Sequence, residues 1–173
     1  IGVLIDDLVT KGVSEPYRML TSAAEYRLLL RHDNADVRLR EKGWQVGLVG
    51  EEAIREHREL VRQMEELKEL LESTVVPPSP EVNEVLIAAG TSPLTQGASL
   101  AQLLRRPEVN LEALLPFAPE AVAAASATLR QRVEIEVKYA GYIQKQIESV
   151  ERFLRLEEKR IPEDFDYSRL LGL

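Results

Sequence analysis

Cysteine is absent from this sequence of 173 residues, and histidine occurs only as His32 and His57. The lack of cysteine excludes disulfides, thiolate metal sites and thiol nucleophiles. With two histidines, a zinc or iron site would need mostly carboxylates and a serine triad would have two candidate bases, and the sequence shows neither arrangement. His57 falls on the apolar face of a predicted helix, which indicates a packed core residue. His32 lies in a predicted loop between basic residues, where a phosphate contact is a hypothesis.

Long apolar runs are also lacking. No stretch approaches the roughly 20 apolar residues of a membrane-spanning helix, so we expect no membrane association. Hydrophobic residues make up 45% of the chain and charged residues 29%, a balance typical of a globular domain. The apolar start at Ile1 has no charged leader, so we expect no signal peptide and interpret the sequence as a piece of a larger protein.

Glycine-rich phosphate loops are missing as well. The 9 glycines nowhere approach G-x-G-x-x-G or G-x-x-x-x-G-K. We therefore expect no nucleotide or cofactor binding by this chain alone. Adjacent acids occur at Asp6 and Asp7, but neighbouring residues on a helix diverge by about 100°, so a helix cap or solvated turn is the favoured interpretation over a catalytic pair.

The N-terminal third predicts short elements. Residues 1–5 are β-branched enough to predict a short strand, followed by one helical turn that ends at Gly12. Ser22 and Glu25 have capping-box spacing, which predicts a helix over 23–31. Asn34 then predicts the start of a helix that ends near Gly47.

Two long amphipathic helices follow, over 51–74 and about 130–160. The first ends at Pro77-Pro78, and Ser79 with Pro80 predicts the start of another helix. Prolines between 90 and 119 favour two short helices, and an alanine-rich run from Ala118 leads into the second long helix, which should stop before Pro162. Residues 167–173 predict one more turn.

The predicted fold class is therefore all-α, a helical domain with two long packed helices and several short ones. Short extended and helical elements at 1–48 precede the long helices of residues 49–173.

Charge is distributed in bands. The formal net charge is −7, from 22 basic and 29 acidic residues, which argues against general polyanion binding. Residues 17–50 carry 6 basic and 4 acidic side chains (+2), residues 51–72 carry 4 basic and 8 acidic (−4), and residues 130–160 carry 8 basic and 6 acidic (+2). Any nucleic-acid contact would use the two basic bands.

The second basic band contains a heptad stripe of cations. These residues, spaced by seven and drifting about 20° per step around a helix, are Lys138, Lys145, Arg152 and Lys159. Tyr139 and Tyr142 lie near its start. Cations and exposed tyrosines on one helical face can follow an RNA backbone and stack on an unpaired base.

Intrahelical pairing is an open alternative for this stripe. Glu134 precedes Lys138 by four residues and Glu148 precedes Arg152 by four, the favourable order for ion pairs on a solvated face. Lys145 is freer, because Gly141 stands four residues before it, although Glu148 could still reach it.

Several sequence blocks resemble a known family. The first blocks are IGVLIDDLVTKG at 1–12, EPYRM at 15–19, AEYRLLLR at 24–31 and DNAD at 33–36, and the later ones are LRRPE at 104–108, VEI at 133–135, KYAGYI at 138–143, Ile161-Pro162 and Asp166-Tyr167. In composition and order they resemble the GidA/MnmG family over nearly the whole chain. One departure is Ala23, where the family usually has an arginine.

The resemblance implies a C-terminal portion of an FAD- and NADH-dependent cytoplasmic enzyme that modifies C5 of the wobble uridine of tRNA, as a homodimer with an MnmE-type GTPase. Residues 1–48 would be the tail of the FAD-binding domain, and the helical domain would bind tRNA and dock the partner. No cofactor site is expected in this fragment, nor catalysis by it alone.

Two hypotheses remain open. In the first, the basic bands bind tRNA through a candidate set consisting of Arg18, Arg27, Arg31, Lys138, Tyr142, Lys145, Arg152 and Lys159. In the second, the chain is a structural or oligomerisation scaffold that does not contact RNA.

Overall fold

The computed structural model describes residues 2–20 and 26–157 of the chain. The described elements are, in order, α1 (Gly2–Thr10), α2 (Ala35–Gln45), α3 (Glu51–Ser73), β1 (Val75–Val76), α4 (Pro80–Ala88), β2 (Ala98–Ser99), α5 (Leu100–Leu104), α6 (Leu111–Leu114), the 3-10 turn η2 (Leu115–Phe117), α7 (Glu120–Ala124) and α8 (Ala127–Glu157). The predicted all-α class is confirmed. None of the described helices has the length and apolar content of a bilayer crossing.

The first long helix, α3, matches its predicted range. Its buried side chains recur every three to seven residues along one face, and they are Ile54, His57, Met64, Leu67 and Leu71. His57 has an exposed fraction of 4%, which confirms it as a packed core residue. The helix ends at Ser73, and Pro77 and Pro78 follow a few residues later, where they prevent its continuation.

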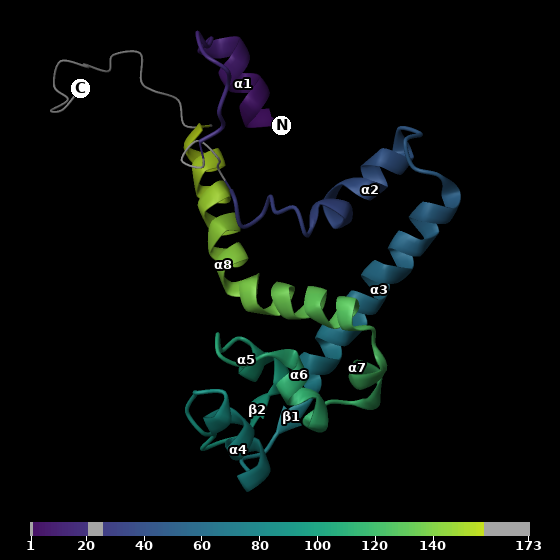
Figure 1. Cartoon of the computed structure of the whole chain (residues 1–173), viewed down its shortest axis with the longest axis vertical. Helices are drawn as coiled ribbons and strands as arrows, with labels where there is room; N and C mark the ends of the chain where they lie inside the picture. Colours follow the sequence, from purple (N-terminus) through teal and green to yellow (C-terminus); the bar gives the residue numbers. More distant parts are fainter. Residues whose placement is uncertain (1, 21–25, 158–173) are drawn as a thin grey trace, which may run out of the picture.

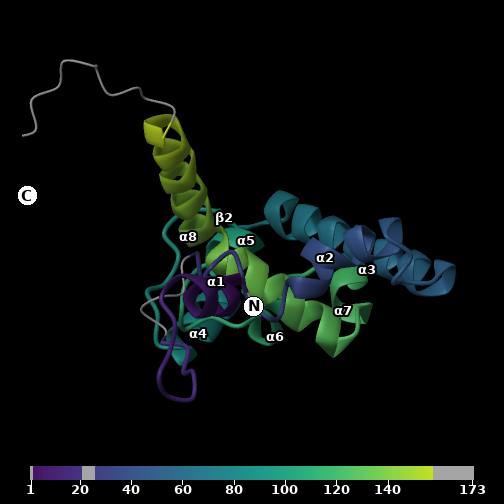
Figure 2. The ribbon, with the colours of Figure 1, turned by 90° about the horizontal axis from the view of Figure 1, so that it is seen from above.

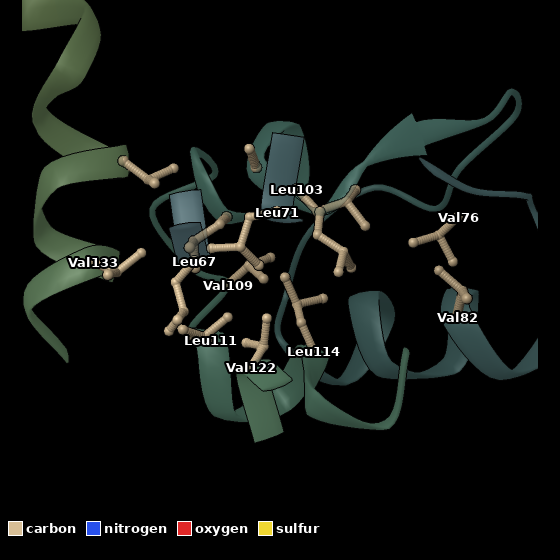
Figure 3. Packing of buried hydrophobic residues seen from close by; sticks show 14 of the residues in the cluster. Leu67, Leu71, Val76, Val82, Leu103, Val109, Leu111, Leu114, Val122 and Val133 are labelled. Carbon is tan, nitrogen blue, oxygen red and sulfur yellow. The ribbon is translucent and has the colours of Figure 1, made fainter. Parts of the chain in front are cut away.

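The apolar core lies between α3 and the short helices that follow it (Figure 3). Leu71, Leu104 and Leu114 are completely buried, and they come from α3, α5 and α6. Val122 of α7 and Val133 of α8 also have no exposed surface. Each short helix is too short to be stable alone, so its stability comes from this packing.

A two-stranded antiparallel pair closes one side of the core. Val75 pairs with Ser99 and Val76 with Ala98. Gly97 permits the approach, since an added Cβ would lie 3.3 Å from the Cγ1 of Val75. The strands have only two residues each, too few for a periodic sequence signal, and the sequence analysis did not predict them.

The cap predicted at Ser79 is confirmed. Its hydroxyl accepts a hydrogen bond from the N–H of Val82 at 3.3 Å, and Pro80 occupies the first helical position. The two short helices predicted between 90 and 119 are confirmed as α5 and α6, with η2 as an addition.

The alanine-rich run is interrupted, contrary to the expectation of a continuous helix. α7 ends at Ala124, and Ala125 has extended backbone angles. The Ser126 hydroxyl accepts from the N–H of Leu129 at 3.2 Å, so it caps the new helix α8. The helix propensity of alanine contributes little free energy per residue. The cap at Ser126 and the packing of Val122 outweigh it.

The second long helix, α8, packs against α3 through its first half only. Figures 1 and 2 show it crossing α3 and then changing direction, so that its C-terminal half projects beyond the neighbouring elements. The buried residues are Leu129, Val133 and Val137, whereas the apolar stripe expected from the sequence contains Ile135 and Tyr139, two positions further along and so on nearly the opposite side of the helix. Gly141 lies inside this helix, where the missing side chain and greater backbone freedom permit bending.

The predicted strand at 1–5 is wrong, because residues 2–10 form the helix α1. A lone strand leaves its backbone hydrogen bonds unmade, whereas a helix makes them within itself. At the end of α1, the Thr10 hydroxyl donates a hydrogen bond to the carbonyl of Asp6, four residues earlier, at 2.6 Å.

The predicted helix over 23–31 is wrong for residues 26–31, which form turns; Ser22 and Glu25 lie outside the described residues. Tyr26 has a φ of +52°, and its carbonyl accepts from the N–H groups of both Leu29 and Leu30 at 2.9 Å. That conformation is unfavourable for a bulky residue and incompatible with helix propagation.

The helix predicted to begin at Asn34 is confirmed as α2, but Asn34 does not cap it through its side chain. Its amide instead donates to the carbonyl of Leu29 at 3.0 Å and accepts from Nε of Arg38 at 2.9 Å. Asn34 therefore joins the preceding turn to the helix. The predicted stop before Pro162 and the turn at 167–173 lie outside the described residues.

Candidate nucleic-acid interface

The described members of the cation stripe, Lys138, Lys145 and Arg152, all lie on α8. Lys159, the last member, lies outside the described residues. The three cations follow one another along α8 as expected, but their environments differ. Lys138 is held by contacts within the protein, whereas Lys145 and Arg152 are exposed.

Lys138 is engaged in structure. Its Nζ lies 3.0 Å from Oε1 of Glu134 and donates to the carbonyl of Pro107 at 3.3 Å. Its side chain is only 24% exposed. The intrahelical pairing alternative therefore holds at this position, and Lys138 also ties α8 to the loop after α5.

Lys145 and Arg152 are exposed, and neither makes a hydrogen bond or ion pair to another side chain within 2–20 and 26–157. Glu148 instead accepts from Nε2 of Gln144 at 3.2 Å. Tyr142 has an exposed fraction of 63% and lies one turn before Lys145. These three side chains give the projecting half of α8 a cationic surface with an aromatic ring.

Arg31 is already held on several sides. Its Nε and Nη2 donate to Asp33 at 3.0 Å each, and its Nη1 donates to the carbonyl of Leu28 at 2.8 Å. The guanidinium carbon stands 5.2 Å from the ring centroid of Tyr139. The hydrogen bond from Arg31 lowers the pKa of Asp33. Arg31 therefore shapes this region, and its donors are largely occupied.

Arg18 and Arg27 are exposed, as is His32. Arg18 follows a loop fixed by Asp7, whose carboxylate accepts from Lys11 Nζ and from the Tyr17 hydroxyl at 2.7 Å each. These two hydrogen bonds lower the pKa of Asp7. The Asp7 carboxylate thus anchors a loop, consistent with the structural interpretation of the acidic pair.

Two contacts that the sequence analysis missed bring the basic bands together. Arg132 of α8 donates to Asp36 of α2 at 2.8 Å, and the N–H of Leu29 donates to Oε1 of Gln146 at 3.1 Å. Burial raises the pKa of Asp36, but hydrogen bonds from Arg132 and the Val37 N–H outweigh this and lower it. No pattern in the sequence signals pairs that are about one hundred residues apart.

Beside the Arg132–Asp36 pair lies a groove between the segment 27–33 and α8, and Arg132 is part of its lining. Its volume is about 800 Å³, and its lining includes Arg27, Leu30, Ile135 and Tyr139. The groove is open to solvent along its length, and charged side chains from both basic bands border it. It is one of the places in the described chain where residues of both bands line the same surface.

The acidic band, by contrast, is internally neutralised in part. Arg62 pairs with Glu59 at 2.6 Å and also with Glu66. Hydrogen bonds from Arg62 and Gln63 lower the pKa of Glu59 to about 2. These pairs follow the three- and four-residue spacing of the helix, so this part of the acidic face of α3 is a solvated and internally paired surface.

The described residues do not fit a flavin by themselves. Dinucleotide binding in the common flavoprotein folds uses a strand, a glycine-rich loop and a helix N-terminus. The described sheet consists of two strands of two residues each, and no glycine motif of that kind occurs in the sequence. Within 2–20 and 26–157, no three His, Asp or Glu side chains converge as metal ligands would.

The comparisons with known proteins agree with one another. Residues 51–147 match the family described as the tRNA modifying enzyme MnmG/GidA C-terminal helical domain. The chain is 51% identical over 173 residues to the tRNA uridine 5-carboxymethylaminomethyl modification enzyme MnmG of Geobacillus thermodenitrificans and 49% identical to that of Caldicellulosiruptor saccharolyticus. All of this chain is covered, against 27% and 28% of those relatives.

A solved structure supports the same assignment. The chain resembles Aquifex aeolicus GidA with a TM-score of 0.69 and 35% identity, over 99% of this chain and 26% of that one. The chain thus spans about a quarter of the length of its relatives. With a helical fold that matches over almost every residue, and with the family match covering α3 through most of α8, the chain belongs to the MnmG/GidA family.

Proposed function

We propose that this chain is the part of a tRNA-modifying enzyme that holds tRNA, through the surface formed by α8, Arg18 and the turns of residues 26–33. The observation that carries the proposal is the projecting half of α8, where Lys145 and Arg152 are exposed beside Tyr142. Phosphate neutralisation supplies most of the affinity of such surfaces, and an exposed tyrosine adds stacking on unpaired bases.

The local charge supports tRNA binding despite the net charge of −7. Two glutamates of α3, Glu59 and Glu66, pair with Arg62 of the same helix, whereas Lys145, Arg152, Arg18 and Arg27 are exposed. Charges further apart than the Debye length of about 10 Å are largely screened at physiological salt, so the cations nearest to a bound RNA backbone contribute most to its affinity.

The activity proposed for the whole protein follows from its relatives. We propose a cytoplasmic, homodimeric enzyme that uses FAD and NADH to modify C5 of a wobble uridine in tRNA, and residues 1–48 as the tail of its flavin domain. The flavin would be held outside this chain, and this helical domain would dock the MnmE-type GTPase. No chemical step is assigned to residues of this chain.

A salt titration tests tRNA binding. Affinity of the chain for tRNA should fall as salt rises, because each neutralised phosphate releases counterions. Lys145→Glu should weaken binding about tenfold at low salt and flatten the salt dependence by about one contact. Fluorescence anisotropy with labelled tRNA measures both quantities.

Arg55→Glu is the matched control. Arg55 is an exposed residue of α3, so its reversal changes net charge by the same amount on the acidic helix. Equal losses for both variants would show that only overall charge matters. Affinity that is absent, or that does not change with salt, would contradict the proposal.

A scaffold function is the second candidate. Phe153, Leu154 and Leu156 are each more than half exposed near the end of α8, and exposed apolar side chains favour protein contacts. The scaffold function would be favoured if the chain does not bind tRNA but captures the GTPase or associates with itself. Phe153→Ser should then abolish that association, and Lys145→Glu should retain it.

A further inference from the structure

We infer that the groove between residues 27–33 and α8 binds one unpaired base of an RNA together with its phosphate. The inference rests on the proposed tRNA-binding function and adds to it a defined site, separate from the projecting cations of α8. Nothing in the sequence pattern joins the residues that line it, because they come from two segments about one hundred positions apart.

One wall of the groove is a continuous face of α8. Four of its residues are spaced by four, three and four, which places them on one side of the helix, and they are Thr128, Arg132, Ile135 and Tyr139. The opposite wall is the turn segment with Leu30. The volume of the groove, about 800 Å³, is within the range of small-molecule sites and is large enough for a nucleotide.

Apolar surface in the groove lacks a cover among the described residues. Leu30 is 57% exposed, Met19 is 51% exposed and Tyr139 is 39% exposed. A planar base laid between them would remove this apolar surface from water. The guanidinium of Arg31, held by Asp33, fixes the ring of Tyr139 from one side, so little conformational freedom is lost on stacking.

The charge at the groove favours an anion. Arg31 and Arg132 are each balanced by an aspartate, at 3.0 and 2.8 Å. Arg27 lines the groove and has no acidic partner within 2–20 and 26–157, and exposed His32 lies beside it. A phosphate next to the stacked base would meet Arg27.

The polar groups in the groove suit a base edge. The hydroxyl of Thr128 and the amide of Gln131 are exposed and can both donate and accept hydrogen bonds. In a duplex the base faces are already stacked on their neighbours, so the groove selects an unpaired position.

Two RNA probes of equal length test the inference, a hairpin with an unpaired loop and a fully paired duplex. The chain should bind the hairpin more tightly. Tyr139→Leu keeps the apolar volume and removes the aromatic face, so it should lose about tenfold in hairpin affinity and little in duplex affinity. Tyr139→Phe should retain the preference, and Arg27→Ala should weaken both probes.

Phe153→Leu is the control, since Phe153 is an exposed aromatic of the same helix that does not line the groove. Salt-dependent binding of both RNAs with equal affinity would overturn the groove while leaving the proposed function standing. The inferred base site would also be overturned if a polyglutamate peptide displaced the labelled hairpin as effectively as unlabelled hairpin does. Binding of neither RNA would contradict the groove and the proposed function together.

Discussion

Two regions of this chain are held together by different forces. The inner lobe, defined as residues 51–137, has a core of leucine and valine in which most members have almost no exposed surface. The outer surface, defined as residues 17–36 with 138–157, has no fully buried side chain among its described residues. Apolar burial therefore fixes the inner lobe, and polar contacts position the outer surface.

This difference separates stability from recognition. Buried apolar area contributes most of the free energy of folding and is insensitive to salt, whereas surface ion pairs are weak and screened. The outer surface can thus carry cations and exposed apolar groups that would be costly in the core. Three sets of substitutions test the comparison, beginning with the core.

Leu71→Ala should have the largest effect. Leu71 has no exposed surface and lies where α3 meets the short helices. Loss of its buried volume should lower the free energy of unfolding by about 2–5 kcal/mol. Urea denaturation followed by circular dichroism measures the change.

Leu48→Ala is the matched control for this prediction. Leu48 is 83% exposed in the turn before α3, so the same substitution should change the free energy of unfolding by less than about 0.5 kcal/mol. Similar losses for both variants would mean that burial does not account for the effect of Leu71→Ala.

The helices of the inner lobe were predictable because their signals are local. The periodic face of α3 and the cap at Ser79 depend on residues within a few positions of each other. The break after Ala124 and the pair of β1 with β2 depend on packing and on partners far along the chain. The strand predicted at 1–5 is wrong because β-branched content alone does not supply the pairing partner that a strand needs, and residues 2–10 form a helix.

The candidate site was predictable only as a list of cations. Heptad spacing placed Lys138, Lys145 and Arg152 on α8. It could not show that Lys138 pairs with Glu134 and donates a hydrogen bond to the carbonyl of Pro107. The groove was missed because Arg132 meets Asp36 across the fold. Such contacts are set by tertiary structure and leave no local pattern.

The Asp36–Arg132 pair joins the outer surface to the inner lobe, and it should have an intermediate effect. Both side chains are about one quarter exposed, at 24% and 29%. A double-mutant cycle with Asp36→Ala and Arg132→Ala should give a coupling of about 1 kcal/mol. A coupling near zero would mean that the pair does not hold the two regions together.

The pH dependence of this pair has a defined sign. Although burial raises it, hydrogen bonds from Arg132 and from the Val37 N–H hold the folded-state pKa of Asp36 below the ordinary value of an aspartate. A group with a depressed folded pKa stabilises the protein above its unfolded pKa, and this contribution is lost as pH falls through the folded value. Thermal unfolding should therefore show a smaller effect of Arg132→Ala below about pH 4 than at pH 7.

Gly141→Ala should have the smallest effect and should raise stability. Gly141 lies within α8, an added Cβ meets no atom within 4 Å, and its φ is not in the left-handed region. Alanine lowers the backbone entropy of the unfolded chain, so a gain of about 0.5–1 kcal/mol is expected. Urea denaturation measures the gain, and the tRNA titration on the same variant shows whether the projecting half of α8 must bend further to bind.

Unchanged affinity with higher stability would mean that the direction of α8 is set by the hydrogen bond between Leu29 and Gln146 rather than by the glycine. A loss of stability would instead show that Gly141 is required for the bend itself, and that the outer surface stores strain which the inner lobe does not.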